Sequence, residues 1–246
     1  MPTLKDQKAR ELLVSGNDAR FDALMLAQQR AFALLSVIEE RALIRRGRTE
    51  REIEQDILSI AQIEFGVDQH WHKRIVRSGE NTLAVFADNP PILEVRDDDV
   101  VFVDLGPVFD DWEADIGKTY VIGSNPQKIA LFEELERQFE LINKRLNEAP
   151  SVTGAELYRY ACDSAREAGY RFGGQIAGHI VAEFPHARLP GERQIHHISP
   201  ANPLPLSDPD PLGNKRYWII EVHLISADGG FGGFYERLAR PIARAG

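Results

Sequence analysis

The sequence has little that could cross-link the chain or carry it across a membrane. Its 246 residues include one cysteine, Cys162, so no disulfide can form within the chain. We expect Cys162 to be a small buried hydrophobe in a helix. No uninterrupted apolar run approaches the roughly 20 residues of a membrane-spanning helix, and the first residues are too polar for a signal peptide. These absences predict a cytoplasmic protein without a membrane partner.

Positive charge is also scarce. The 29 Lys and Arg residues are outnumbered by 38 Asp and Glu residues, which gives a formal net charge of −9. This balance argues against nucleic acid or an anionic membrane as the main partner. The hydrophobic content of 43% and charged content of 27% are ordinary for a globular protein. The length suits one large domain with a substantial core.

Two acids near the middle of the chain lie at the ends of strand-like segments. The apolar run 100–103 predicts a buried strand that ends at Asp104, and residues 118–122 predict another strand just beyond Asp115. Turn residues between the segments favour a hairpin-like pair that brings the two carboxylates together. Burying both is costly unless a cation lies between them. On this stretch alone, a metal site and a solvated acidic turn both remain open.

Four long helices are predicted by apolar spacing and by end signals. Residues 20–46 carry one apolar stripe, and arginines with Gly47 are expected to end that helix. Thr-x-x-Glu capping boxes predict helices at 49–66 and 153–169, and an Asn-Pro pair begins a helix at 125–150. The predicted buried positions of the first and third helices are Leu24, Ala27, Ala31, Leu34, Leu35 and Ile38, and Phe132, Leu135, Phe139, Ile142 and Leu146.

The remaining segments complete a mixed architecture. A short helix or arm is expected at 4–14, and further strands at 74–77, 82–86 and 217–225. The two capping boxes are 104 residues apart, which suggests two related halves. The proline-rich segment 187–215 is predicted to be a surface loop that acts as a lid or a dimer contact.

Four further residues could carry chemistry. Glu221 lies in the middle of a strand, where an unpaired carboxylate is strongly unfavourable, and an arginine partner would be the ordinary solution. His179 follows a glycine, and a hydrogen-bonded core histidine is the ordinary interpretation of such a residue. His186 lies seven positions further on, and Glu236 follows two aromatics near the end of the chain.

Together these residues resemble the pita-bread metallopeptidases: methionine aminopeptidase, aminopeptidase P, prolidase and creatinase. The resemblance covers about residues 20–240. Its motifs are Val-Asp104-Leu-Gly, then eleven residues later Ala-Asp115-Ile-Gly-Lys-Thr-Tyr, then Gly-His179, His186, Ile-Glu221 and Tyr-Glu236-Arg. Thr-Glu-Arg-Glu-Ile and Ser-Gly-Glu-Asn are similar to the aminopeptidase P branch. The resemblance implies an α/β (α+β) fold of two pseudosymmetric halves, with helices packed on a curved, mainly antiparallel sheet. Residues 20–246 would form the catalytic domain after an arm at 1–19.

The resemblance also implies two divalent metal ions, with Mn²⁺ expected first and Co²⁺, Fe²⁺ or Zn²⁺ as alternatives. Asp115 and Glu236 would bridge the ions, Asp104 would hold one, and His179 and Glu221 the other. Four carboxylates and one imidazole form an oxygen-rich donor set that suits these ions. His186 would hydrogen-bond the substrate or the intermediate, and Glu221 could also pass a proton to the leaving amine.

Some positions depart from the family pattern. Phe86 and Ala87 stand where these peptidases have a substrate-contacting histidine, and Gln175 replaces a second histidine of the aminopeptidase P branch. His70 or His72 could substitute and contact the substrate, although two surface histidines are the simpler interpretation.

Three functions follow from this pattern. The leading one is hydrolysis of an amide bond in a small peptide, of the Xaa-Pro aminopeptidase or methionine aminopeptidase type, by a water that bridges two metals. The second keeps the metal site but acts on a non-peptide small molecule, as a creatinase-like hydrolase or lyase. The third is a pita-bread binding module without activity. A homodimer is a further expectation, and His196 and His197 are expected to be exposed to solvent.

Overall fold

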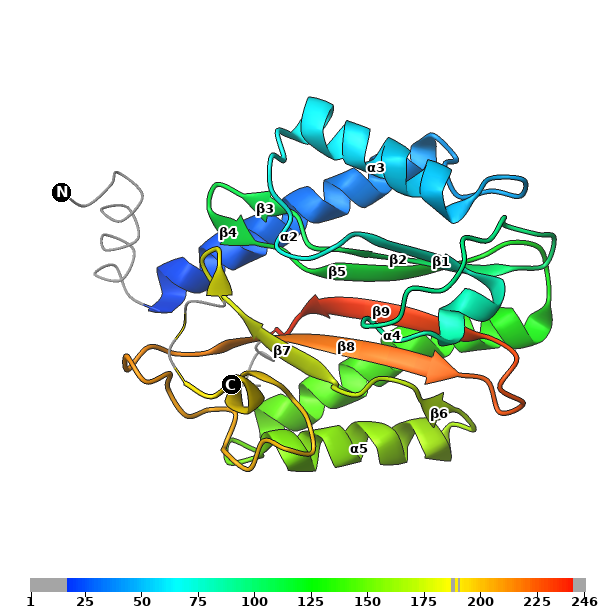
Figure 1. The fold of residues 1–246 in the computed structure, drawn as a ribbon. Coiled ribbons are helices and arrows are strands. Elements are labelled where there is room, and N and C mark those ends of the chain that lie inside the picture. Colours follow the sequence, from blue (N-terminus) through cyan, green and yellow to red (C-terminus); the bar gives the residue numbers. More distant parts are fainter. Residues whose placement is uncertain (1–16, 187–188, 190, 241–246) are drawn as a thin grey trace, which may run out of the picture.

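A computed structural model describes residues 17–240 of the chain, apart from 187, 188 and 190 (Figure 1). The short helix or arm expected at 4–14 lies outside these residues. The helices are α2 (Asn17–Glu40), α3 (Glu50–Phe65), α4 (Pro126–Glu148) and α5 (Gly154–Glu167), with short 3-10 helices η1 (Gly79–Leu83) and η3 (Arg193–His196). The strands are β1 (Ile75–Ser78), β2 (Val100–Leu105), β3 (Val108–Phe109), β4 (Trp112–Glu113), β5 (Ile116–Val121), β6 (Arg171–Phe172), β7 (Gly178–Val181), β8 (Tyr217–Ile225) and β9 (Gly232–Leu238).

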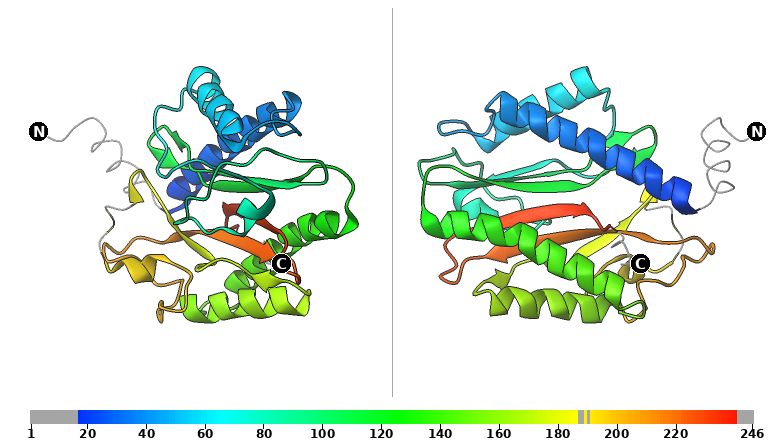
Figure 2. Two further views of the ribbon diagram at one scale, coloured as in Figure 1. Left: turned by 45° about the vertical axis from the view of Figure 1, so that its right-hand side comes forward. Right: turned by 180° about the vertical axis from the view of Figure 1, so that it is seen from behind.

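The main sheet is antiparallel throughout the described residues. Its order is β1-β2-β5-β9-β8-β6, and β7 also pairs with β8. The inner helices α2 and α4 cover one face of the sheet, as the view from behind in Figure 2 shows, while α3 and α5 lie further out. This arrangement confirms the predicted helices on a mainly antiparallel sheet. Strands β1, β2 and β5 belong to one half of the chain, and β6–β9 to the other.

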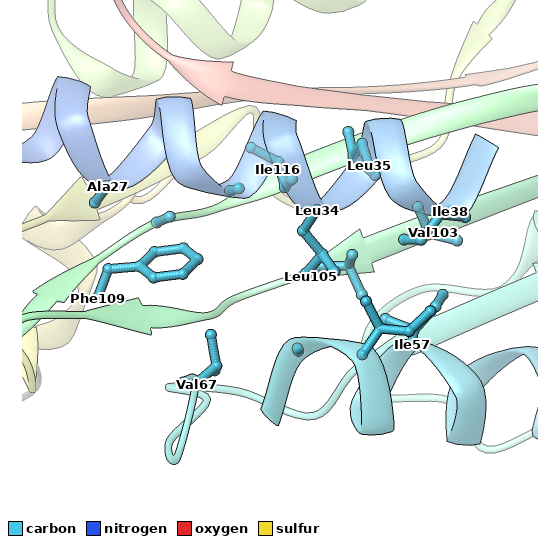
Figure 3. Packing of buried hydrophobic residues seen from close by; sticks show 14 of the residues in the cluster. Ala27, Leu34, Leu35, Ile38, Ile57, Val67, Val103, Leu105, Phe109 and Ile116 are labelled. Atoms are coloured by element: carbon cyan, nitrogen blue, oxygen red, sulfur yellow. The ribbon is translucent and has the colours of Figure 1, made fainter. Parts of the chain in front are cut away.

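Strand alternation assigns opposite faces to neighbouring residues. Val101, Val103 and Leu105 of β2 are buried in one apolar cluster with α2 and α3 (Figure 3). The residues between them, Phe102 and Asp104, therefore point to the face that the helices leave free. That open face carries the candidate site.

Helix α2 ends earlier than predicted. It stops at Glu40, and Ala42 adopts a left-handed conformation with φ 48°. The Leu43 N–H donates to the Ile38 carbonyl, and the Ala42 N–H donates to the Glu39 carbonyl. This is the Schellman pattern that glycine usually provides. The predicted helix end at residue 46 is therefore wrong, because Ala42 adopts the left-handed conformation that ends the helix.

One helix in the described part of the chain is long and apolar enough, by composition alone, to cross a membrane. It covers Ala19–Glu40 with a mean hydropathy of 1.3. The stripe predicted for this helix is nevertheless buried within the protein, with every residue from Leu24 to Ile38 named above at most 4% exposed. A core helix passes the same test, and the core packing accounts for the composition here.

Both predicted capping boxes are present. The Thr49 side chain accepts from the Glu52 N–H while the Glu52 carboxylate accepts from the Thr49 N–H, and Thr153 and Glu156 do the same. The boxes begin α3 and α5, the outer helices of the two halves. The sequence separation of 104 residues thus corresponds to equivalent places in the structure.

Three local predictions are wrong. Residues 82–86 form no strand, because η1 ends in this segment and the Thr82 hydroxyl donates to the Gly79 carbonyl at 2.6 Å. Phe132 is 42% exposed, and Leu131 takes its buried place on α4. Segment 187–215 is not simply a surface loop, since Ile198, Asn202 and Leu206 are at most 2% exposed.

Cys162 is only half-buried rather than a core residue. Its position on α5, inside a predicted helix, is as expected.

The exposure of two phenylalanines on α4 predicts unequal effects of truncation. Phe139 is 1% exposed and Phe132 is 42% exposed. We expect Phe139→Ala to lower the free energy of unfolding by about 3–5 kcal/mol through lost burial and a cavity. Phe132→Ala, which changes the same residue type on the same helix, should cost less than about 1 kcal/mol. Urea denaturation of both variants provides the comparison, and equal losses would contradict the assignment of the buried face.

Candidate metal centre

Three acids lie in one row across the open face of the sheet. Asp104 on β2 is paired with Gly117 on β5, Gly117 with Glu236 on β9, and Glu236 with Glu221 on β8. Directly paired residues of antiparallel strands have side chains in contact distance. The row therefore brings the three carboxyl groups together, although they come from positions far apart in the sequence.

Gly117 makes the row possible. A Cβ atom at this position would lie 2.5 Å from the Phe234 ring and 3.0 Å from the Cβ of Glu236. A larger residue would therefore displace the ring or the Glu236 side chain. The space that the glycine leaves allows the carboxyl groups of the neighbouring strands to approach from both sides.

Asp115 lies two residues before Gly117 and so faces the same side. It is 2% exposed, and each of its oxygens faces a different histidine. Oδ1 is 3.2 Å from Nε2 of His72, and Oδ2 is 2.9 Å from Nε2 of His179. The predicted convergence of Asp104 and Asp115 on neighbouring strands is present as well.

Two groups of potential ligand atoms share Asp115. One contains His72, Asp104 and Asp115, and the other contains Asp115, His179 and Glu236. In each group the donor atoms lie within 4.8 Å of one another. The first group also has His72 Nε2 at 3.4 Å from Asp104 Oδ1, and the second has His179 Nε2 at 3.6 Å from Glu236 Oε1.

His179 is held by the backbone around it. It lies on β7, and the preceding Gly178 has φ 140°, where a Cβ atom would be 2.0 Å from the Ile219 carbonyl oxygen. Its Nδ1 lies 2.8 Å from the carbonyl oxygen of Ile180, which leaves Nε2 facing Asp115. Only glycine permits β7 to approach β8 this closely.

Glu221 has a buried oxygen without a partner. Its Oε1 is shielded from solvent and has no hydrogen bond among the described residues. The residues on either side of it in the strand are apolar. Burial, together with the nearby Asp115 and Asp104 carboxylates, raises the pKa of Glu221 to about 8. Glu221 is not part of either three-residue group, but it is the direct cross-strand neighbour of Glu236. An orphaned carboxylate oxygen next to four ligand-type side chains fits a bound cation.

The pKa values of the other acids and of His72 indicate that the site has too little positive charge for its carboxylates. Burial raises the pKa of Asp104 to about 7 and that of Glu236 well above its usual range. For Asp115, burial acts in the same direction, but the imidazoles of His72 and His179 outweigh it and lower its pKa to about 2. Burial disfavours charge on His72, yet Asp104 and Asp115 raise its pKa to about 9. The carboxyl groups can therefore all ionise only if cations neutralise them, and the residues present fit divalent ions.

His186 belongs to a second arrangement beside the two groups. Its backbone N–H and its Nδ1 contact the two oxygens of Glu113 at 2.8 and 2.6 Å. Glu113 is 1% exposed and lies on β4. Strand β4 follows a tight turn in which Asp110 and Asp111 have φ of 49° and 71°, as in a two-residue hairpin. The hairpin thus aims a buried carboxylate at His186.

Trp71 packs against three imidazoles of the site. The centre of its ring lies 4.4 Å from that of His72, 5.1 Å from that of His179 and 4.9 Å from that of His186. Its indole N–H donates to the Ala114 carbonyl at 3.2 Å. The indole therefore covers the histidines and limits the access of water.

The remaining predicted positions have mixed outcomes. His72 is not a surface histidine, since its side chain is 5% exposed and contacts the two acids. Phe86 is 55% exposed, with its ring centre 5.8 Å from that of His72, and Gln175 is exposed in the turn between β6 and β7. His70 is partly buried, and neither ring nitrogen has a hydrogen bond among the described residues.

The two histidines of the long loop are not exposed as predicted. His196 is 9% exposed. His197 is partly buried and forms an isolated bridge with His179. Burial lowers the pKa of His197 to about 4. The loop therefore packs beside the strand that carries His179.

Glu113 and Trp71 were not identified from the sequence. Glu113 lies in an acidic turn, where a solvated side chain is the usual case, and its contact with His186 joins residues 73 positions apart. For Trp71 the sequence did contain a signal, because Trp71 lies between two histidines in His70-Trp-His72. Such a run is uncommon on an exposed polar surface.

The fold has counterparts among known proteins. Residues 23–235, most of the chain, match metallopeptidase family M24. Prolidase from Thermococcus sibiricus superposes with a TM-score of 0.71 at 22% identity, over 93% of this chain and 58% of that one. X-Pro aminopeptidase from Thermotoga maritima gives 0.67 at 22% identity, over 94% and 60%. Xaa-Pro dipeptidase from Bacillus anthracis gives 0.65 at 19% identity, over 90% and 57%.

The chain thus spans less than two thirds of the length of these three proteins. A comparison with curated proteins gave no match. At such identities the structural similarity shows the shared fold, which is the pita-bread arrangement expected from the sequence. The match to the family covers most of the chain and decides membership. The chain belongs to metallopeptidase family M24.

Proposed function

We propose that this chain is a metal-dependent hydrolase that cleaves an amide bond in a small peptide, of the Xaa-Pro aminopeptidase or methionine aminopeptidase type. The observation that carries the proposal is the position of Asp115, a buried carboxylate whose two oxygens each belong to a separate group of potential ligands. A carboxylate placed in this way is suited to bridge two cations. Family membership supports the proposal, and several proteins of the same fold are described as acting on Xaa-Pro substrates.

Asp104, Asp115, His179, Glu221 and Glu236 would hold two divalent ions. Four carboxylates balance the charge of two such ions, and the oxygen-rich set favours Mn²⁺, with Co²⁺, Fe²⁺ and Zn²⁺ as alternatives. Bound together, the ions would lower the pKa of a water between them and polarise the carbonyl of the substrate.

The side chains around the ions have separate tasks. Glu113 accepts from Nδ1 of His186 at 2.6 Å, so Nε2 of the ring remains for a hydrogen bond to the substrate. Glu221, whose buried Oε1 has no hydrogen bond among the described residues, could take part in passing a proton to the leaving amine. Trp71 shields the imidazoles, which strengthens electrostatic interactions at the site.

A non-peptide amide is the second candidate substrate. Phe86 stands where related peptidases have a substrate-contacting histidine, and it is 55% exposed beside the site. Gln175, at the position of a second such histidine, is exposed as well. An apolar side chain in place of a hydrogen-bonding one favours a substrate with a different group at that position.

Replacement of Glu221 tests the location of the chemistry. We expect Glu221→Gln to reduce turnover by about 100-fold or more, because the amide can neither pass on a proton nor offer the metal ions a negatively charged ligand. The assay is hydrolysis of a panel of Xaa-Pro dipeptides and unrelated amides by the metal-loaded protein. Glu133→Gln, which changes an exposed glutamate on α4, is the control and should retain full activity. Turnover of amides but of no dipeptide would favour the second substrate class, and an active Glu221→Gln variant would place the chemistry elsewhere.

The raised pKa values predict how stability changes with pH. Glu221 rises from an ordinary value of 4.5 to about 8, and His72 from 6.5 to about 9. Raised values contribute stability that is present below the ordinary pKa and is lost as the pH rises through the raised one. His70 and His197, with pKa values of about 4, do not titrate in that window. The melting temperature of metal-free protein should therefore fall between about pH 7 and 9.

Divalent ions should reverse this loss. A bound ion takes the place of the protons, so Mn²⁺ should raise the melting temperature more at pH 8.5 than at pH 6.5 and should release protons on binding. Differential scanning calorimetry and titration in two buffers measure both effects. A melting temperature that rises with pH without metal, or is unchanged by Mn²⁺, would contradict the site and favour an inactive binding module.

Glu113 is expected to act as a positioning residue for His186. Glu113→Gln keeps the size of the side chain but removes the charge that fixes Nδ1–H. We expect kcat to fall at least about tenfold with a smaller change in KM. The pH–rate profile should move as well, since a structural defect alone would leave it in place. A profile identical to that of the wild type would indicate that Glu113 only packs.

A further inference from the structure

His72 and His179 have the same hydrogen-bonding arrangement. Nδ1 of His72 lies 2.6 Å from the carbonyl oxygen of Lys73, and Nδ1 of His179 lies 2.8 Å from that of Ile180. In each case the acceptor belongs to the next residue. A carbonyl can only accept, so Nδ1 carries a proton in both rings. Such a bond to the remote nitrogen is typical of histidines that bind metals through Nε2.

The Nε2 atoms of both rings then face acceptors. Nε2 of His72 is 3.2 Å from Asp115 Oδ1 and 3.4 Å from Asp104 Oδ1. A lone pair on Nε2 would face the lone pairs of two carboxylates, which is unfavourable unless a proton or a metal ion lies between them. Nε2 of His179 faces Asp115 and Glu236 in the same way. A metal ion in each group would relieve the contact between the Nε2 lone pair and the carboxylates of that group.

The distances match a shared metal ion. Ligand atoms at about 2.1 Å from one ion, separated by the angles of octahedral or tetrahedral coordination, lie roughly 3.0–3.4 Å apart. The two contacts of His72 Nε2, at 3.2 and 3.4 Å, fall within this range. These two distances suit donor atoms of one ion, and the donor atoms of the whole group lie within 4.8 Å of one another.

The position of His72 is built into the fold. Segment 69–72 pairs with 106–108 through the Trp71 N–H to the Gly106 carbonyl and the Val108 N–H to the Gln69 carbonyl. A Cβ atom on Gly106 would lie 2.2 Å from Cδ2 and 2.4 Å from Nε2 of His72. The space that this glycine leaves, directly after the strand that carries Asp104, is thus filled by the imidazole.

We infer that His72 is a metal ligand, the imidazole of the ion on the Asp104 side. The inference rests on the proposed function, because it concerns the same metal centre, and it adds a sixth protein ligand to the five that the sequence resemblance implies. Each of the two groups of ligand atoms would then contribute one imidazole, and Asp115 belongs to both groups. A second nitrogen donor would shift the metal preference from Mn²⁺ toward Co²⁺ and Zn²⁺.

Metal binding by matched histidine variants tests the inference. Metal-free protein is titrated with Mn²⁺ and with Co²⁺ by calorimetry, and nitrogen coupling to bound Mn²⁺ is measured by pulsed electron paramagnetic resonance. His72→Gln should lose about tenfold or more in affinity for one of the two ions and should lose one of two imidazole couplings. It should also lose more affinity for Co²⁺ than for Mn²⁺. His70→Gln, two positions away in the same segment, should behave like the wild type, and His179→Gln should lose one coupling.

A measurement on the wild type alone guards against a variant that does not fold. Both Nδ1–H groups are hydrogen-bonded, so the Co²⁺-loaded protein should show two strongly shifted imidazole N–H signals in its proton magnetic resonance spectrum. A single such signal, or a His72→Gln variant that binds two ions with unchanged affinity and coupling, would overturn the inference while the proposed function stands. A wild type that binds no divalent ion would overturn both.

Discussion

Electrostatic repulsion among buried carboxyl groups is the constraint on which the rest of this structure depends. Asp104, Asp115 and Glu236 are at most 7% exposed, and an oxygen of Glu221 is buried without a partner. An apolar sheet cannot hold four such groups in ionised form without compensation. Protons and two imidazoles can reduce this charge, since burial raises the pKa of Asp104 to about 7 and that of Glu221 to about 8. Divalent cations would do so without leaving the carboxylates protonated.

The constraint acts at the junction of the two halves. Asp104 and Asp115 come from the first half, and His179, Glu221 and Glu236 come from the second. The central strands β5 and β9 pair at Gly117 and Glu236, within the row of acids. Next to that pair, the Thr119 hydroxyl donates to the Phe234 carbonyl and accepts from the Phe234 N–H, both at 2.8 Å. A cation at the site would therefore hold together strands that each half supplies separately, so metal binding and the packing of the halves should be coupled.

Local signals in the sequence were sufficient for much of the fold. The capping boxes at Thr49 and Thr153 place two helix starts because the bonds that define them lie within four residues. The stop of α2 was missed because Ala42 adopts a conformation that the sequence gives no reason to expect of alanine. The prediction of the buried side of α4 was partly wrong. Phe132 and Leu131 are both apolar, and only the packing against the sheet decides which of them is buried.

The candidate site was predictable to the extent that its residue types are unusual where they occur. Asp104 and Glu221 stand out because acids are uncommon in apolar strands, and the spacing to Asp115 and His179 adds to that signal. Glu113 gave no such signal, and His72 gave only a weak one, as one of the two histidines that flank Trp71. Their surroundings in the sequence are polar, and their burial arises from contacts with segments tens of residues away. Such residues emerge only when the register and the connecting loops are known.

Segment 69–72 brings an imidazole to the acids of the site through its backbone pairing. Its backbone pairs with residues that follow Asp104, so the segment is fixed by the same strand that fixes the acid. A side chain at position 72 then necessarily lies over Gly106, because the glycine leaves that volume open. An imidazole of this size reaches two carboxylates from there, and Phe86 packs beside it rather than entering the site. The position of the histidine relative to the acids is therefore a consequence of backbone pairing.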